Sequence, residues 1–216
     1  MKIIKPHESL DLLAPYLPPH PIIVEAGAFT GSDSLKIARR WPQAQIHAFE
    51  PVPELFVALR EKTAPYPNIT CYQLGLGSYN GTATLYLSQK PTKITQASSL
   101  LAPKERLHSS PITFDTTIEI PIMTLDSWAA QYQIPRIDLL WLDLQGMELA
   151  VLQTAPDILK KIKTIHIEVA TSERYTGQPL VQEVKEWLEK NSFEILAKDF
   201  DETKRNFGNL IVLNRH

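Results

Sequence analysis

The chain has little cysteine and little glycine for its length. Among 216 residues there is one cysteine, Cys71, and glycine occurs 8 times. A single cysteine excludes an intrachain disulfide, so an apolar core must stabilise the fold and no oxidising compartment is required. Cys71 falls within an apparent strand at 69–74, which predicts a small buried residue rather than a reactive thiol.

Long apolar runs and a strong charge of one sign are also missing. No run approaches the roughly 20 residues that a membrane-spanning helix needs. The first residues, with Pro6, His7 and Glu8 after two lysines, lack the apolar core of a signal peptide. The formal net charge is −2, and the basic residues are scattered. We therefore expect a cytoplasmic protein with no membrane span and no nucleic-acid partner.

The rest of the composition is that of an ordinary globular protein. Apolar residues make up 44% of the chain and charged residues 21%. A chain of this length can bury most of the surface that its unfolded form exposes. We expect a single domain over residues 1–216, with an N-terminal extension at 1–20 and an insertion at 82–121. Nothing in the composition indicates an oligomeric state.

Short apolar segments bounded by turn residues recur at the spacing of β-α-β units. Helices are expected to begin near Ser32, Pro53 and Glu148. Strands are expected at 22–26, 45–49, 69–74, 137–142 and 164–169. Because crossovers between parallel strands are almost always right-handed, the pattern predicts an α/β Rossmann-like fold. We expect a mostly parallel sheet with helices on both faces.

Two parts of the chain depart from this pattern. Residues 82–87 and 116–120 alternate like strands and enclose a polar segment, which predicts an inserted hairpin with a mobile loop. Residues 96–100, in the middle of this insertion, have a loop composition and could cover a site. A final helix at 180–189 is followed by a predicted C-terminal antiparallel hairpin, with strands at 193–197 and 209–213.

A turn with two glycines follows the first predicted strand, where ligands of open α/β sheets bind. The residues from Glu25 to Gly31 read Glu-Ala-Gly-Ala-Phe-Thr-Gly. Gly27 permits a tight turn and close approach of a ligand, and Gly31 lets the chain enter the helix. A purely steric role of both glycines is an equal alternative. The turn is not Gly-x-Gly-x-x-Gly, so a ligand without phosphates, such as S-adenosylmethionine, fits better than a dinucleotide.

An acidic residue follows the second predicted strand directly. Glu50 stands 23 positions after Gly27. At that spacing a carboxylate can accept hydrogen bonds from both ribose hydroxyls of a bound nucleoside. The alternative is a solvated glutamate that precedes Pro51.

Four segments together resemble the FkbM-type S-adenosylmethionine-dependent methyltransferases, from about residue 22 to residue 213. The segments are Val24–Gly31, Ala48–Pro53, Thr124–Ser127 and Asp138–Glu148. The resemblance implies a Rossmann-like fold, S-adenosylmethionine as cofactor and methyl transfer to a hydroxyl oxygen of a small molecule or sugar. The cofactor-binding residues that it implies are Glu25, Gly27, Ala28, Phe29, Thr30, Gly31, Glu50, Pro51, Gly75, Leu76 and Asp143.

This chain departs from the family pattern at two positions. The family usually has aspartate at the position of Glu25 and glutamate at the position of Gln145. Glu25 can still accept a hydrogen bond from the cofactor's amino group or through water. Gln145 lacks a negative charge, which leaves open a non-catalytic module that binds the cofactor without transferring its methyl group.

Several polar residues near strand ends are candidates for catalysis. Asp143 ends the fourth parallel strand and could take a proton from a substrate hydroxyl, although capping of the next helix is an equal alternative. Glu168 is the second candidate, and His166 on the same strand face is expected to be a satisfied core histidine. Glu148 is expected to complement the dipole of the helix that it begins, and Asp126 to be a helix cap.

Two serines of the insertion, Ser98 and Ser99, are expected to contact cofactor or substrate, with an unstructured linker as an equal alternative. Two other enzyme classes stay open. A nucleotide-dependent oxidoreductase or epimerase on a related fold is disfavoured because the third glycine of its turn is missing. A metal-assisted transferase is disfavoured because the acidic residues and His166 have no diagnostic ligand spacing, so we predict no metal.

Overall fold

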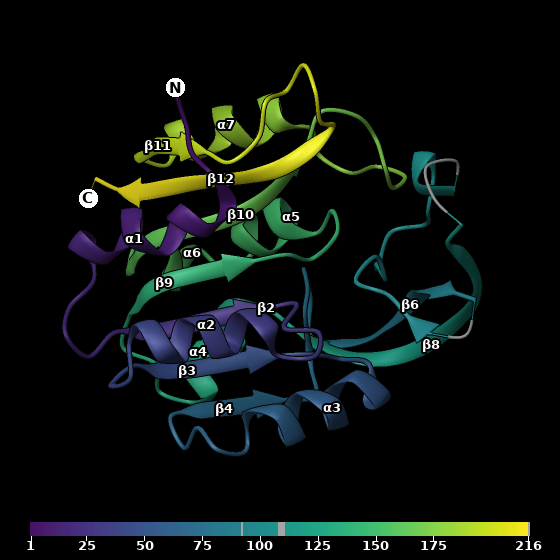
Figure 1. The fold of residues 1–216 in the computed structure, drawn as a ribbon, viewed down its shortest axis with the longest axis horizontal. Coiled ribbons are helices and arrows are strands. Elements are labelled where there is room, and N and C mark those ends of the chain that lie inside the picture. Colours follow the sequence, from purple (N-terminus) through teal and green to yellow (C-terminus); the bar gives the residue numbers. More distant parts are fainter. Residues whose placement is uncertain (92, 108–110, 216) are drawn as a thin grey trace.

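The computed structural model describes residues 1–91, 93–107 and 111–215. Within them, eight strands form one sheet in the order β1-β11-β12-β10-β9-β2-β3-β4 (Figure 1). Neighbouring strands are parallel, except that β12 runs antiparallel to both β10 and β11. The strands are β1 (Lys2–Ile3), β2 (Ile22–Ala26), β3 (Gln45–Phe49), β4 (Ile69–Tyr72), β9 (Ile137–Leu142), β10 (Ile162–Ala170), β11 (Phe193–Lys198) and β12 (Phe207–Asn214).

The predicted α/β class, the mostly parallel sheet and the antiparallel C-terminal hairpin are therefore confirmed. The strand predicted at 69–74 was too long, because β4 ends at Tyr72 and the chain leaves the sheet there. Residues 1–20, predicted as an extension, add β1 to the sheet edge beside β11.

Alternation along the strands directs apolar side chains to both faces of the sheet. On β2, Ile23 belongs to the apolar cluster under α1 and α2, whereas its neighbour Val24 belongs to the cluster under α4 to α7. The third helix, α3, packs on the first of these faces through Leu59 and Ala48. The α-helices are α1 (Ser9–Leu13), α2 (Ser32–Arg40), α3 (Pro53–Thr63), α4 (Leu125–Gln131), α5 (Glu148–Gln153), α6 (Pro156–Leu159) and α7 (Val181–Lys190).

Helix α4 begins as the sequence predicts, but Asp126 does not cap it. Thr124 is the N-cap, and its hydroxyl accepts a hydrogen bond from the backbone N–H of Ser127 at 3.2 Å. The Asp126 carboxylate instead accepts the N–H groups of Asp157 at 3.0 Å and Ile158 at 2.8 Å, in the first turn of α6. Asp126 is thus a cap for a different helix, and the capping pattern in the sequence belongs to Thr124.

The chain order reverses between β2 and β9, since β3 and β4 lie on one side and β10 on the other. A crevice forms at such a point, beyond the carboxyl ends of the strands. Here the two loops touch: the N–H of Asp143 donates to the carbonyl of Ala26 at 3.0 Å. Gly27 has φ +90°, and a Cβ there would lie 2.0 Å from the carbonyl oxygen of Asp143. Gly27 therefore lets its turn lie close to the loop after β9, which contains Asp143.

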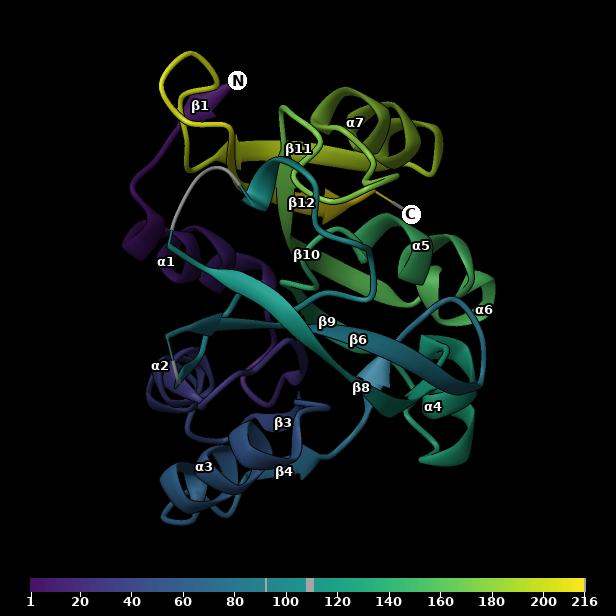
Figure 2. The ribbon, with the colours of Figure 1, turned by 90° about the vertical axis from the view of Figure 1, so that its right-hand side faces the viewer.

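The insertion forms a second sheet over this crevice, in the order β5-β8-β6-β7 among the described residues. Its strands are β5 (Gly75–Leu76), β6 (Gly81–Lys90), β7 (Lys93–Ile94) and β8 (Thr113–Met123). The predicted hairpin is confirmed, with longer strands than expected. Figure 2 shows β6 and β8 crossing in front of the main sheet. Residues 92 and 108–110 of the insertion lie outside the described residues, and the rest includes one 3-10 turn at Glu105–Leu107.

Cys71 lies in β4 as predicted but is only half-buried, because β4 is an edge strand. Its Sγ lies 3.4 Å from the hydroxyl of Thr63, and partial burial raises the pKa of the thiol. In the part of the chain that the structure describes, every helix is too short or too polar to cross a membrane.

Candidate functional site

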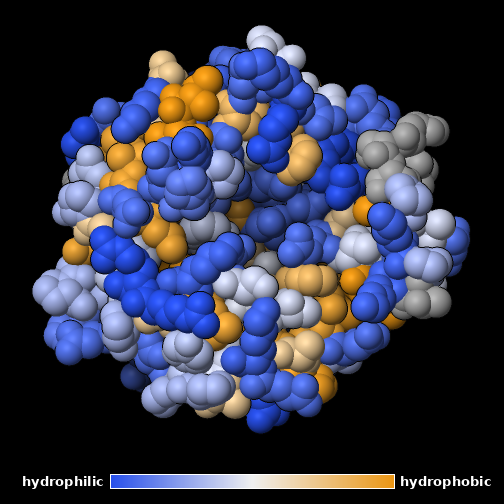
Figure 3. Space-filling model, in the orientation of Figure 1, coloured by the Kyte–Doolittle hydropathy of each residue, from blue (hydrophilic) through white to orange (hydrophobic). Residues whose placement is uncertain are grey.

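A pocket opens at the carboxyl edge of the main sheet, between the loops after β2, β3 and β9 and the insertion. It holds about 950 Å³ of atom-free space, the open solvent at its mouth included. Figure 3 shows that this face of the protein is hollowed near its middle, where hydrophilic residues gather. The predicted cofactor residues that line the pocket are Gly27, Ala28, Phe29, Glu50, Pro51, Gly75, Leu76 and Asp143.

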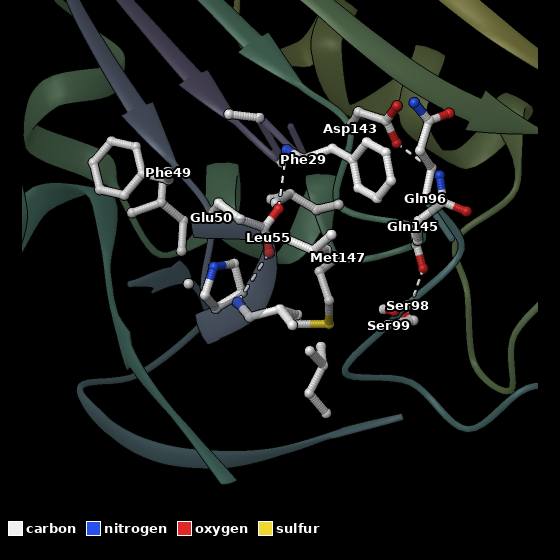
Figure 4. Close-up of a pocket in the computed structure, with 18 of the residues that line it drawn as sticks. Phe29, Phe49, Glu50, Leu55, Gln96, Ser98, Ser99, Asp143, Gln145 and Met147 are labelled. Atoms are coloured by element: carbon white, nitrogen blue, oxygen red, sulfur yellow. Dashed lines mark hydrogen bonds between the residues drawn. The ribbon is translucent and has the colours of Figure 1, made fainter. Parts of the chain in front are cut away.

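Glu50 lies in the middle of the pocket wall (Figure 4). Its carboxylate accepts the N–H of Phe29 on one oxygen and the N–H of Val52 on the other, each at 2.9 Å. Phe29 has a left-handed φ of +51°, uncommon outside glycine. Glu50 is 5% exposed, so the solvated alternative is wrong, and burial raises its pKa to about 7. Each oxygen keeps a lone pair for a further donor.

Three predicted cofactor residues lie outside the pocket wall. The side chain of Glu25 faces α2 instead, and its carboxylate accepts a hydrogen bond from the hydroxyl of Ser34 in that helix. Burial raises the pKa of Glu25 to about 8. Thr30 and Gly31 directly precede α2, and a Cβ on Gly31 would lie 2.8 Å from the side chain of Leu59 in α3. Gly31 therefore allows α2 and α3 to pack closely. This is the steric role that the sequence left open as an alternative for this glycine.

Gln145 links the two predicted catalytic carboxylates. Its Nε2 donates to Asp143 Oδ1 at 2.7 Å and to Glu168 Oε2 at 2.8 Å. Its Oε1 accepts the hydroxyl of Tyr175 at 2.9 Å and the guanidinium of Arg174 at 3.3 Å. Asp143 and Gln145 line the pocket, whereas Glu168 lies outside its wall. The structure thus brings both carboxylates to one amide but presents only Asp143 to the pocket.

The loop after β9 bears on one of the two alternatives for Asp143, capping of the next helix. Its carboxylate bonds to Gln145 and not to the start of α5, so the helix-capping alternative is wrong. Glu148 holds this loop instead, since its carboxylate accepts the N–H groups of Leu144 at 2.7 Å and Gly146 at 3.0 Å. Burial raises the pKa of Glu148 to about 7 and also raises the pKa of Asp143.

One oxygen from each of Asp143, Glu148 and Glu168 lies within 4.8 Å of the others, a spacing that a hard cation could bridge. These carboxylates are already engaged by N–H donors. Gln145 donates to two of them, backbone amides donate to the third, and the guanidinium of Arg174 lies 3.4 Å from Glu168. The donor set therefore fits a hydrogen-bond network better than a metal site.

His166 is a core residue, as predicted. Its ring stacks on Trp141 with 3.5 Å between the ring centroids, and burial lowers its pKa to about 3. The expectation that it is satisfied was wrong, because its Nδ1 has no hydrogen-bond partner among the described residues.

Ser98 and Ser99 line the pocket in an ordered loop, so the unstructured alternative is wrong. The hydroxyl of Ser99 donates to the carbonyl of Gln145 at 2.8 Å and accepts the N–H of Leu101 at 3.0 Å. The hydroxyl of Ser98 accepts the N–H of Ser88 at 3.1 Å. The Ser99 hydroxyl thus holds the insertion loop against the loop after β9, and the Ser98 hydroxyl holds it against β6.

The sequence analysis missed Arg174 and Tyr175, which follow β10 at the same edge of the sheet. The hydroxyl of Tyr175 lies 2.7 Å from the carbonyl of Ala97, and the N–H of Lys104 donates to the carbonyl of Arg174 at 2.9 Å. Gln96 belongs to the loop at 96–100 that was expected to cover a site, and Figure 4 shows it at the same end of the pocket as Asp143. The rule that polar residues after parallel strands form the site would have found Arg174 and Tyr175.

Comparison with known proteins shows which protein family this chain resembles. The methyltransferase FkbM domain matches residues 25–195. The 2-O-methyltransferase NoeI of Sinorhizobium fredii is 28% identical over 184 residues, which cover 83% of this chain and 75% of that protein. Methyltransferase sdnD of Sordaria araneosa is 28% identical over 208 residues, covering 83% and 76%.

The crystal structure of methyltransferase FkbM from Methylobacillus flagellatus has the same fold, with a TM-score of 0.63 and 14% sequence identity. The match covers 97% of this chain but 48% of that one, so this chain spans about half the length of that protein. Because the domain match extends over most of the chain, this protein belongs to the FkbM methyltransferase family.

Proposed function

We propose that this protein transfers the methyl group of S-adenosylmethionine to a hydroxyl oxygen of a small molecule or sugar. The observation that carries the proposal is a pocket at the point where the strand order reverses. It brings together the glycine turn, Glu50, the segment Gly75–Leu76 and Asp143. An oxygen acceptor is supported by NoeI, which is described as a 2-O-methyltransferase.

The residues present fit such a cofactor. The Glu50 carboxylate has one free lone pair on each oxygen, which suits the two adjacent hydroxyls of a ribose. Pro51, Val52 and Leu76 give the pocket an apolar wall beside it, which suits an adenine ring. The methionine end would then lie toward the glycine turn and Asp143. When bound, the cofactor supplies a methyl group on a positively charged sulfur.

The protein's part in the transfer is alignment and removal of one proton. An acceptor oxygen forms a bond to the methyl carbon as the carbon–sulfur bond breaks, and the hydroxyl proton leaves. Asp143 is the carboxylate at the pocket wall, and we assign it the role of proton acceptor. Glu168 lies outside the pocket wall and accepts a hydrogen bond from the same amide nitrogen of Gln145 as Asp143 does. Ser98, Ser99 and Gln96 shape the acceptor side of the pocket.

Binding is tested first, with S-adenosylhomocysteine and with NAD as the control ligand. A ligand at 100 times its dissociation constant stabilises the folded state by about 2.7 kcal/mol, so the melting temperature should rise with the first ligand only. Neither heat nor a thermal shift at millimolar S-adenosylhomocysteine would contradict the proposed cofactor, and a shift with NAD would favour an oxidoreductase.

Transfer is tested next, with labelled S-adenosylmethionine and a panel of glycosides, other small alcohols, amines and RNA. Incorporation of label into hydroxyl compounds supports the proposal. Label in RNA or amines alone would contradict the acceptor class. Cofactor binding without transfer to any acceptor would favour the non-catalytic module.

A further inference from the structure

A neutral amide lies between two carboxylates, the half-buried Asp143 at the wall of the pocket and the buried Glu168 outside that wall. Gln145 is 5% exposed, and its Nε2 lies 2.7 Å from Asp143 Oδ1 and 2.8 Å from Glu168 Oε2. An amide nitrogen carries two hydrogens, so it can donate one to each carboxylate. Figure 4 shows Asp143 and Gln145 together at the end of the pocket opposite Phe49.

The surroundings determine which end of the amide faces the carboxylates. The other end of Gln145 lies 3.3 Å from the guanidinium of Arg174, which can only donate, and 2.9 Å from the hydroxyl of Tyr175, whose single hydrogen is shared with the carbonyl of Ala97. An NH₂ group facing Arg174 would meet a donor, and the amide oxygen would then face two carboxylates, so both ends would be unsatisfied. The guanidinium on one side and the carboxylates on the other therefore hold the NH₂ group toward Asp143 and Glu168.

The charges around the amide are divided unequally. Arg174 is 3% exposed and lies 3.4 Å from Glu168, so this pair neutralises itself inside the protein. Asp143 has no comparable close ion pair among the described residues, and it lines the pocket. The charged groups that face Asp143, from every element packed against it, are Glu25, Asp33, Arg106, Glu148, Glu168 and Arg174.

We propose that Gln145 is a positioning residue that gives the two carboxylates different roles. It holds Asp143 ionised at the pocket wall, facing the positively charged sulfur and the acceptor oxygen, and it fixes Glu168 as the buried partner of Arg174. This inference rests on the proposed function, because it needs the cofactor's sulfur beside Asp143. An ionised glutamate at position 145 cannot perform this role, since a carboxylate has no hydrogens to donate, and a protonated one has a single hydrogen for two acceptors.

The test compares two ligands that differ in the charge of the sulfur. S-adenosylmethionine and S-adenosylhomocysteine share the amino acid and ribose groups, so the ratio of their dissociation constants cancels the titration of those groups. In the unmodified protein, the preference for S-adenosylmethionine should increase with pH as Asp143 loses its proton. The ratio is measured by calorimetry from pH 5 to pH 9.

Two variants remove the bridge in different ways. Gln145→Asn shortens the side chain by one methylene, and asparagine tolerates the left-handed φ of +51° at this position. Gln145→Glu keeps the size but replaces the donor by an acceptor. A lost hydrogen bond to a charged group should raise the midpoint of the pH dependence by about one unit, a tenfold change in proton affinity. The glutamate variant should raise it further, because it adds a like charge.

Gln178→Asn is the matched control. Gln178 is also buried, and it lies beside the same loop, with its Cγ 3.3 Å from where a Cβ on Gly146 would be. Its Oε1 has no hydrogen-bond partner among the described residues, and we place it outside the site. The control should leave the midpoint unchanged.

Three results would overturn the inference: a ratio that does not vary with pH in the unmodified protein, an unchanged midpoint in both Gln145 variants, or an equal shift in the Gln178 control. Thermal melting of each variant shows whether it is folded at the pH used. Failure of the unmodified protein to bind either ligand at any pH would instead refute the proposed function, and the inference with it.

Discussion

Replacement of Glu50 by alanine is the sharpest test of how the pocket binds a nucleoside. The carboxylate is 5% exposed and bonds to Phe29 and Val52, which fix it in the pocket wall. Its two remaining lone pairs are proposed to accept both ribose hydroxyls. Glu50→Ala removes these acceptors and leaves two backbone N–H groups without their partner.

The expected loss follows from the number of bonds. A hydrogen bond to a charged group is worth roughly 1.5–3 kcal/mol, and each 1.4 kcal/mol is about one decade in affinity. At that size, loss of one such bond weakens binding by about one to two decades, and loss of both by about two to four decades. We therefore expect the dissociation constant of S-adenosylhomocysteine to rise by at least about tenfold.

The pH dependence provides a second measure of the same group. Burial raises the pKa of Glu50 to about 7, and the ionised form is the one that accepts two hydroxyls. Affinity in the unmodified protein should therefore fall as the pH decreases through about 7. Glu50→Ala should lack this decrease, because the titrating group is gone.

Glu54→Ala is the control for Glu50→Ala. Glu54 is an exposed glutamate in the first turn of α3, four positions further along the chain. It should bind the ligand as the unmodified protein does. Unchanged calorimetric affinity in a folded Glu50→Ala protein, or an equal loss in Glu54→Ala, would refute the assignment of Glu50 to the ribose.

Three further changes test the frame around the pocket. Gly27→Ala should lower the free energy of unfolding in urea by at least about 2 kcal/mol, because its Cβ would lie 2.0 Å from the carbonyl oxygen of Asp143 at a φ of +90°; full stability would contradict that contact. Burial raises the pKa of Glu25 from 4.5 to about 8, so the folded protein binds a proton at this group more tightly than the unfolded chain does. The free energy of unfolding should therefore fall as the pH rises from 4.5 to about 8. The difference in melting temperature between Glu25→Gln and the unmodified protein should therefore favour the variant more at pH 8 than at pH 5. A difference that stays constant with pH would refute this reasoning. Tyr175→Phe should speed hydrogen exchange in residues 95–101, since it removes the hydroxyl 2.7 Å from the Ala97 carbonyl; unchanged exchange would show that this contact does not hold the loop.

The main sheet was predictable because its strands carry their own signal. Buried parallel strands such as Ile22–Ala26 and Ile137–Leu142 are nearly continuous apolar runs, and turn residues mark their ends. The second sheet was seen only in part. The pairing of Gly75–Leu76 with β8 depends on contacts 47 positions apart, between Gly75 and Ile122, and two residues carry no periodicity of their own.

The pocket was predictable where residue type and position coincide, as with Glu50 after β3. The orientation of side chains was not predictable from position alone. Glu25 precedes the glycine turn by two residues, but it faces α2, where Ser34 is its partner. The same limit applies to Gln145, because its role depends on Arg174 and Tyr175, which approach from the end of a different strand.

The position of Gln145 also explains why the insertion and the proposed proton acceptor form one unit. The carbonyl of Gln145 accepts the hydroxyl of Ser99, while its side chain bonds to Tyr175 and Asp143. Tyr175 in turn lies 2.7 Å from the carbonyl of Ala97 in the same insertion loop. The loop cannot move away without breaking its contacts to the backbone of Gln145 and to Tyr175, which bonds to the side chain of Gln145. An acceptor that displaces this loop would therefore also misplace Asp143, so the fit of the acceptor side controls the geometry of proton removal.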